Sequence, residues 1–336
     1  MDRTRIARNG LMAAVLWAAF AGSVAMSMFL SHDAGAGSAI WTANGFAVGA
    51  LLILPRPWSL AVLAACVASQ FGLGIVAGHG LARVAVTSTI NAGEMVLAAL
   101  LTQRFCGIGA RRLGIVRLTR ILIFAVAPSA TLGGLAAAIA QMAISPRPFT
   151  DVWRDWLVSG GMGMAVVLPG LLLAARFGQY RDFHRSWIET AGLFLALAAL
   201  TAAVFMQTAL PLFFIIFPAV TFIAFRLGPP GAALAGFVVG GVALPLTLLG
   251  HGPAALARNL DFAGEVRLAE AFVAAILVSG VATGTALADQ NRLRRLLVWR
   301  DRSARSSRQR AQAAERVAGL LAVRASGGNP RAGDLA

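Results

Sequence analysis

The nineteen residues 157–175 contain no charged side chain, and this run constrains the fold more than any other feature. A helix of that length, at roughly 1.5 Å per residue, covers the hydrocarbon core of a bilayer. Trp153 and Trp156 precede it among charged residues, and indole rings prefer the headgroup boundary because they are apolar with one polar N–H. The run therefore predicts a transmembrane helix with an aromatic collar at one end.

Similar apolar runs follow one another along the whole chain. Of the 336 residues, 58% are hydrophobic and 13% are charged, a composition outside the range of soluble globular domains. The first run exceeds the roughly 7–15 residues of a signal-peptide core, which favours an uncleaved helix. The expected fold class is all-α, a polytopic integral membrane helical bundle of about ten transmembrane helices. We predict spans at 11–30, 38–55, 58–77, 81–104, 121–143, 151–175, 187–206, 210–226, 228–249 and 267–290.

The distribution of arginine sets the expected orientation. With the N-terminus in the cytoplasm, the predicted cytoplasmic segments hold all but five of the 29 basic residues. Basic residues concentrate in this way on the cytoplasmic side of membrane proteins, so we expect an N-in/C-in topology. The expected organisation is a cytoplasmic N-terminus (1–10), a membrane-integral domain (11–290), a short cytoplasmic helix (291–324) and a disordered tail (325–336).

The net charge of +15 does not indicate a nucleic-acid partner. A nucleic-acid binder gathers its basic residues on one water-facing surface, whereas here they lie in short loops between apolar runs. The two cysteines, Cys66 in an apolar run and Cys106 in an arginine-rich loop, predict neither a disulfide nor a metal site. We expect no nucleic acid, no cofactor and no structural metal.

The span 81–104 carries the most informative polar pattern. Arg83, Thr87, Asn91 and Glu94 are spaced by four, four and three residues, so they share one helical face. A charged carboxylate near the middle of a span costs at least about 2.5 kcal/mol, so Glu94 is expected to be paired, protonated or lining a cavity. The alternative is a polar contact that only holds neighbouring helices together.

Other polar residues fall at a similar depth. Counted from the outer ends at 1.5 Å per residue, Asn44, Gln70, Thr87 and Ser159 lie roughly 9–12 Å deep, and Asn91 about 15 Å deep. This layer predicts a ligand pocket open to the outer side. Scattered hydrogen bonds between helices are the competing interpretation.

An internal repeat is a further hypothesis. Residues 41–80 and 213–252 both read as a helix, a turn with arginine (Arg226 in the second copy), a helix and a Gly-His-Gly triplet. The two units would point the same way, as in membrane folds with parallel repeats. His79 and His251 of the triplets are weak candidates for pH or metal sensing. Chance is a competing explanation in so glycine-rich a chain.

After residue 290 the sequence predicts that the last helix continues into the cytoplasm. A heptad reading puts a thin coiled-coil seam on one face, whereas the arginines favour solvent and the anionic cytoplasmic leaflet. The seam residues are Leu293, Leu297, Ala304, Ala311, Ala314, Ala318 and Leu321.

Several motifs, in this order and spacing, resemble the first membrane-associated sensor (MASE) domain family over about residues 10–290. The motifs are Trp41 with Asn44-Gly45, Asn91 with Glu94, the Trp153/Trp156 collar leading to Pro169, Phe217-Pro218 followed by Arg226-Leu227-Gly228, and Gly250-His251-Gly252-Pro253. The family pattern also leads us to expect an acidic residue near position 160, where this chain has Gly160.

The resemblance implies an integral-membrane sensory module of the bacterial inner membrane. Such modules are usually joined by a cytoplasmic helix to a diguanylate cyclase, phosphodiesterase or histidine kinase domain. No cyclase-like Gly-Gly-acidic motif and no histidine follow the last span here, so we expect an input module without its own catalytic output, and not an enzyme. The candidate signal-sensing residues are Glu94, Asn91, Thr87, Asn44, Trp153, Trp156 and Arg226.

Three functions compete at this stage. The leading one is a sensor that relays an extracytoplasmic or membrane-borne signal, with an unidentified small-molecule ligand, to a separate protein. That partner would be a second copy of the chain, or a cyclase or histidine kinase signalling protein. The alternative is a small-molecule transporter or permease with a mid-membrane Glu94 site, which proline-broken spans and a repeat would suit. A remnant that only associates through its helices is the third.

Overall fold

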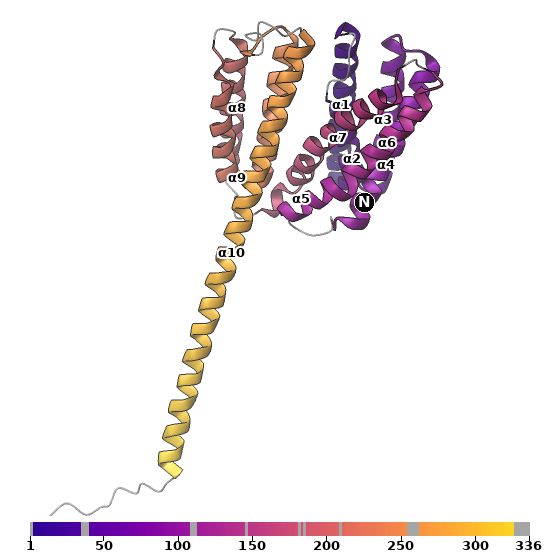
Figure 1. Cartoon of the computed structure of the whole chain (residues 1–336). Coiled ribbons are helices and arrows are strands. Elements are labelled where there is room, and N and C mark those ends of the chain that lie inside the picture. The colour runs from indigo at the N-terminus through magenta and orange to yellow at the C-terminus, as the bar shows by residue number, and fades with distance from the viewer. Residues whose placement is uncertain are drawn as a thin grey trace, which may run out of the picture. The chain divides into compact units, whose positions relative to one another are not determined.

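The computed structural model describes residues 3–34, 40–107, 113–144, 147–180, 183, 186–207, 210–253 and 262–325. Every regular element in this part of the chain is helical, which confirms the all-α polytopic class (Figure 1). The chain divides into two units, Met1–Leu287 and Ala288–Ala336. The α-helices are α1 (Arg3–Ala34), α2 (Ala43–Ile53), α3 (Arg56–Val76), α4 (Leu81–Phe105), α5 (Ile115–Ile121), α6 (Ala127–Gln141), α7 (Phe149–Ala174), α8 (Trp187–Met206), α9 (Ile216–Leu248) and α10 (Phe262–Ala325).

Eight helical stretches among the described residues are long and apolar enough to cross a bilayer. The expected span 121–143 corresponds to α5, a π-helical turn (Leu122–Val126) and α6 in succession. Among the described residues of the expected span 38–55, the eleven of α2 are helical. Since α2 is too short for a full crossing, these helices do not by themselves establish the number of spans.

The helix α9 is folded back on itself at Gly228. This residue has φ 69° and ψ −164°, a conformation that is open to glycine and strained for other residues. Val220 and Ala232 would lie about 18 Å apart along a straight helix, yet a Cβ on Gly280 would lie 3.0 Å from Val220 Cγ1 and 3.7 Å from Ala232 Cβ. The two limbs of α9 therefore form a hairpin, in agreement with the separate runs expected at 210–226 and 228–249.

Within the first unit, α2 lies among α1, α3, α4 and α7 (Figure 1). Glycine allows α2 to approach α7 closely, because a Cβ on Gly45 would lie 2.7 Å from Val167 Cβ. A Cβ on Gly163 of α7 would lie 2.0 Å from the carbonyl oxygen of Trp41, so that backbone packs directly on α7. This close approach brings the start of α2 to the polar residues of α4 and α7.

A second packed region joins α8, α9 and the first part of α10. The Phe272 ring of α10 lies 5.9, 5.7 and 5.7 Å, centroid to centroid, from the rings of Phe205, Phe213 and Phe217. Outside this packing, large apolar side chains such as Leu100, Phe124 and Leu195 are more than half exposed. In a chain of this hydropathy such a surface is suited to lipid.

The second unit consists, as far as it is described, of the remainder of α10. This helix runs to Ala325, so the segment 291–324 is helical. Residues 326–336, most of the tail that was expected to be disordered, lie outside the described part of the chain.

Candidate functional site

Glu94 lies inside the first unit, where α4 meets α7. Its side chain is 3% exposed, and Trp156 Nε1 donates a hydrogen bond of 2.7 Å to Glu94 Oε2. Burying a carboxylate is unfavourable unless it is hydrogen-bonded, and an indole N–H is a donor that α7 can supply in an apolar setting. Glu94, selected as a mid-span carboxylate, and Trp156, selected from the aromatic collar, are therefore direct hydrogen-bond partners.

Asn44 and Asn91 extend this contact toward α2. Both side chains are buried, and Asn44 Nδ2 donates to Asn91 Oδ1 at 3.0 Å. Trp41 Nε1 in turn donates to Asn44 Oδ1 at 2.9 Å. Asn44 also interacts with the Glu94 carboxylate, without the geometry of a hydrogen bond to Oε1. The result is one polar cluster of Trp41, Asn44, Asn91, Glu94 and Trp156.

Glycines of α6 and α7 form the wall beside the carboxylate. A Cβ on Gly133 would lie 2.7 Å from Glu94 Oε2, and one on Gly160 would lie 3.6 Å from Glu94 Oε1. A Cβ on Gly134 would lie 3.1 Å from Trp153 Cδ1. Sequence reasoning missed Gly133 and Gly134, because nothing in the pattern of α6 shows which helix faces Glu94.

Two polar atoms of the cluster region are buried and unsatisfied. Glu94 Oε1 and Trp153 Nε1 have no hydrogen-bond partner within the described ranges. Leaving a buried polar group unpaired costs about 1–3 kcal/mol, so such atoms indicate a missing partner. Gly160, where an acidic residue was expected, lies beside Glu94 Oε1 and offers it no side chain. Glu94 thus keeps one open acceptor, and Trp153, one turn before Trp156 on α7, keeps one open donor.

The segment 40–44, which leads into α2, makes a second contact with α7 and connects the cluster to two further helices, α1 and α10. Trp41 N donates to Ser159 Oγ of α7 at 3.1 Å, and Thr42 Oγ1 donates to Ser23 Oγ of α1 at 3.1 Å. Ile40 N donates to Glu270 Oε2 of α10 at 3.0 Å. Glu270 is 5% exposed, and its Oε1 has no partner among the described residues. Glu270 is a second carboxylate within an expected span, which is a signal the sequence did contain. Because Glu270 lies near one end of the span 267–290, this signal was weaker than that of the mid-span Glu94.

Two candidates make other contacts. Thr87 Oγ1 donates to the carbonyl oxygens of Arg83 and Val84 within α4, at 2.9 and 3.3 Å. Arg226 pairs with Glu189 of α8, to which its Nε donates at 3.0 Å. Ser186 caps α8 by accepting from Glu189 N at 3.2 Å, so Arg226 joins α9 to the start of α8. The structure therefore brings Glu94, Asn91, Asn44 and Trp156 together, with Trp153 adjacent, and leaves Thr87 and Arg226 in separate contacts.

The two Gly-His-Gly triplets share a local geometry. Gly78 and Gly250 have φ 80° and 79°, and each lies two residues past the end of a helix, α3 and α9 respectively. His79 N donates to Gly74 O, and His251 N donates to Leu246 O, which is the Schellman pattern of helix C-caps. Helix capping accounts for the similarity of the triplets without a shared ligand. Among the described residues, no group of three or more His, Cys, Asp or Glu is suited to bind a metal.

The MASE1 family model matches residues 11–291, nearly the whole of the first unit and all of the candidate site. The chain belongs to the MASE1 family. As a MASE1 protein with several apolar helices it is a multi-pass membrane sensory module. No curated protein and no solved structure matches it.

Proposed function

We propose that this MASE1 chain detects an extracytoplasmic or membrane-borne signal at the cluster of Trp41, Asn44, Asn91, Glu94 and Trp156. The observation that carries the proposal is a buried carboxylate with one oxygen held by Trp156 and the other unpaired. A small molecule with a hydrogen-bond donor, or a proton, would satisfy Oε1 and favour one arrangement of the surrounding helices. A ligand shifts an equilibrium only by its differential affinity for two states, and an open acceptor supplies that difference.

The proposed relay uses the segment 40–44. This segment is bonded to Asn91 of α4 through Asn44, and to Glu270 of α10 through the Ile40 N–H. A change in the hydrogen bonds of Glu94, Asn44 and Asn91 would therefore alter the contact between Ile40 and Glu270 of α10. The carboxylate of Glu270 has one unpaired oxygen, which leaves room for an exchange of partners. The signal would reach the cytoplasm through the continuation of this helix.

The proposed receiver is a separate signalling protein. The seam on the 291–324 helix carries Leu293, Leu297 and Leu321, each at least 60% exposed, which suits packing against a second helix. The partner would be a second copy of the chain, or a cyclase or histidine kinase signalling protein. The proposal includes a multi-pass location in the bacterial inner membrane and no catalytic activity of the chain itself.

A transporter is the second candidate, and the buried Glu94 favours it. A carboxylate between α4, α6 and α7 with an unpaired oxygen also suits a coupling-ion or substrate site. A transporter does not need the 40–44 link to α10 or a helical tail. The behaviour of that tail therefore separates the two functions.

Disulfide cross-linking of the tail in membranes tests the proposal. A single cysteine replaces the exposed Ala314 in a chain that lacks Cys66 and Cys106. We expect cross-linked dimers, in a yield that Glu94→Gln and Glu270→Gln both alter. Glu189→Gln is the matched control, because it removes a carboxylate that pairs with Arg226 and takes no part in the relay.

The outcomes are distinct. Dimers whose yield follows Glu94 and Glu270 support a sensor that signals through α10. Dimers that form equally well in all variants would favour a transporter with a passive tail. No dimers at normal expression would argue against self-association. The same membranes should then be examined for a disulfide cross-link between position 314 and a different signalling protein.

A further inference from the structure

The one tyrosine of the chain binds the segment that connects α4 to α5. Tyr180 OH donates a hydrogen bond of 3.0 Å to Leu113 O, and Leu113 N donates to Tyr180 OH at 3.2 Å. Both residues are buried. A phenol hydroxyl donates one hydrogen bond and accepts others, so this single group pairs both main-chain groups of Leu113. The relay through the segment 40–44 does not use this contact.

Phe183 extends the contact to the turn of the α9 hairpin. Phe183 N donates to Tyr180 O at 3.0 Å, so the ring and the hydroxyl belong to one turn of the chain. The Phe183 ring is buried, and a Cβ on Gly228 would lie 2.7 Å from its Cγ. The ring therefore lies directly on the backbone at Gly228. We call Leu113, Tyr180 and Phe183 the clasp, because they join the α4–α5 connection to α9.

The helix α10 packs on the same turn of α9. A Cβ on Gly284 would lie 2.8 Å from Pro229 Cα and 3.3 Å from Gly228 C, so the two backbones are in direct contact. Small residues permit such a close approach between membrane helices. The clasp and α10 thus both contact the turn at Gly228 and Pro229.

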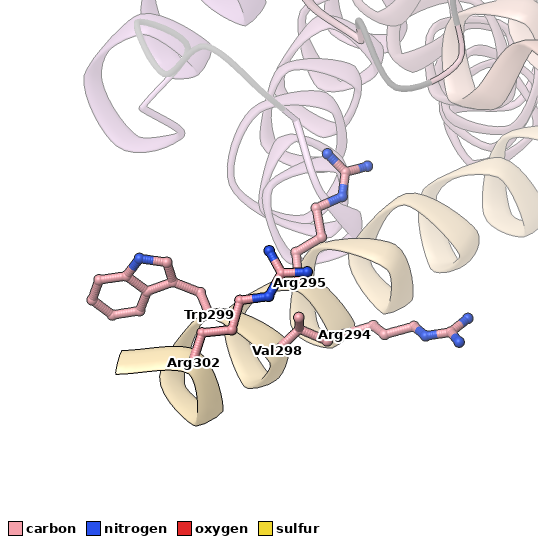
Figure 2. Close-up of a pocket in the computed structure, with 5 residues that line it drawn as sticks. All are labelled: Arg294, Arg295, Val298, Trp299 and Arg302. Atoms are coloured by element: carbon pink, nitrogen blue, oxygen red, sulfur yellow. The ribbon is translucent and has the colours of Figure 1, made fainter. Parts of the chain in front are cut away.

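This contact lies near the end of the α10 span that the topology predicts to be cytoplasmic. Gly284 falls six residues before residue 290, the end of the expected span. The α10 residues that follow include those around a surface hollow, Arg294, Arg295, Val298, Trp299 and Arg302 (Figure 2). Three of these five are arginines, which concentrate on the cytoplasmic side of membrane proteins. The clasp therefore supports α10 close to the point where the helix leaves the bundle.

The clasp and the segment 40–44 hold α10 at two levels. Glu270 accepts from Ile40 N near the start of the helix, whereas Gly284 meets Pro229 fourteen residues later, roughly 21 Å along the axis. A helix held only near its start can tilt at its other end. The second contact therefore determines the direction in which the helix continues.

We propose that Tyr180 is a positioning residue for signal output, and that its hydroxyl fixes α10 near the point where the helix leaves the bundle. The clasp couples the α4–α5 connection to the turn at Gly228 and Pro229, so a shift of α4 or α5 moves that turn and α10 with it. The inference rests on α10 being the output helix of the proposed function. It does not depend on where the signal binds.

Two readouts on the full chain in nanodiscs test the role of Tyr180. Cys106 is 2% exposed and directly follows α4, so its rate of reaction with a maleimide reports opening of the α4–α5 connection. A Cys66→Ala background makes Cys106 the only thiol. Deuterium uptake of peptides covering 281–287 reports the α10 contact, and uptake around Glu270 is the internal reference.

Tyr180→Phe keeps the ring and removes the hydroxyl, which leaves the main-chain groups of Leu113 unpaired. Labelling of Cys106 and exchange at 281–287 should both rise about fivefold, the factor expected for the loss of one buried hydrogen bond. Exchange around Glu270 should stay unchanged. Phe183→Leu should raise the exchange at 281–287 and leave Cys106 protected, because Tyr180 still holds Leu113.

Thr201→Val is the matched control. It removes a buried hydroxyl whose hydrogen bond, 2.8 Å to Leu197 O, stays within α8. Neither readout should change in this variant, because Thr201 takes no part in the clasp.

Several results would overturn the proposal. Unchanged labelling of Cys106 in Tyr180→Phe would show that the hydroxyl does not hold the α4–α5 connection. Faster labelling with unchanged exchange at 281–287 would show that other contacts position α10, and equal increases in Thr201→Val would show general loosening of the bundle. If Tyr180→Phe does not assemble, unchanged exchange at 281–287 in Phe183→Leu has the same consequence. Neither readout involves Glu94 or a dimer of the tail, so the proposed sensing site is tested separately.

Discussion

Trp156 Nε1 donates a hydrogen bond of 2.7 Å to Glu94 Oε2, and this bond joins α7 to the middle of α4 inside the membrane bundle. Both residues come from helices that also contact α6. The bond satisfies one carboxylate oxygen and leaves the other open. The chemistry proposed for the site depends on this asymmetry.

Substitution of Glu94 should separate the polar contact from the carboxylate. Glu94→Gln keeps the volume and an oxygen that accepts from Trp156, so its melting temperature in detergent should stay near that of the wild type. Glu94→Leu leaves the buried Trp156 N–H unpaired and should destabilise the bundle by about 1–3 kcal/mol. Equal melting temperatures for all three proteins would contradict the assigned hydrogen bond.

Gly133 should be sensitive to a single added methyl group. A Cβ there would lie 2.7 Å from Glu94 Oε2, so Gly133→Ala must displace the carboxylate and should lower the melting temperature. Gly93 is the control, since a Cβ on this α4 residue meets nothing within 4 Å. Gly93→Ala should be neutral or stabilising by up to about 1 kcal/mol, as alanine favours helices. A harmless Gly133→Ala would show that Glu94 lies elsewhere.

Gly228 should tolerate no side chain. Its φ of 69° is unfavourable for alanine, and a Cβ would lie 2.7 Å from Phe183 Cγ. Gly228→Ala should therefore destabilise the α9 hairpin by more than about 1 kcal/mol, measured by thermal unfolding. Gly241→Ala, in the second limb with open space around it, is the control and should have little effect. Equal behaviour of the two variants would contradict the hairpin.

Reporter fusions test the topology. The arginine bias predicts ten spans in an N-in/C-in orientation, so a fusion at Arg181 should report the cytoplasm and one at Ala255 the periplasm. The short α2 is the element on which this count depends. If α2 does not cross, the sides reported downstream of it are exchanged, and the predicted topology is wrong.

Local sequence patterns were enough to predict much of the fold and part of the site. Apolar runs gave the helical class, and the spacing of Asn91 and Glu94 on one helical face identified the residues that the structure buries. The break at Gly228 was predicted from the separate runs 210–226 and 228–249. The shortness of α2 was not, because it depends on close packing against α7, which a run of apolar residues does not record. Long-range partners were the main omission.

Arg226 and Glu270 both show that sequence patterns do not identify long-range partners. Arg226 was selected wrongly for the cluster, and Glu270 was missed. Arg226 was selected with Glu94 from its motif, but its partner is Glu189, 37 residues earlier in the chain. Glu270 was overlooked, yet it contacts Ile40, 230 residues away. Pairing between residues so distant in sequence is set by the arrangement of the helices, and no periodicity of one helix reveals it.

Hydrogen–deuterium exchange of wild type and Glu94→Gln in nanodiscs tests the central claim, coupling of the Glu94 cluster to α10, most directly. The account predicts altered protection in peptides from the start of α2 and from the first turns of α10. Glu270→Gln should alter the same two regions from the other end, because energetic coupling between two sites is reciprocal. A change confined to α4, α6 and α7 in Glu94→Gln would contradict the account, since it would show that the site and the signalling helix are independent.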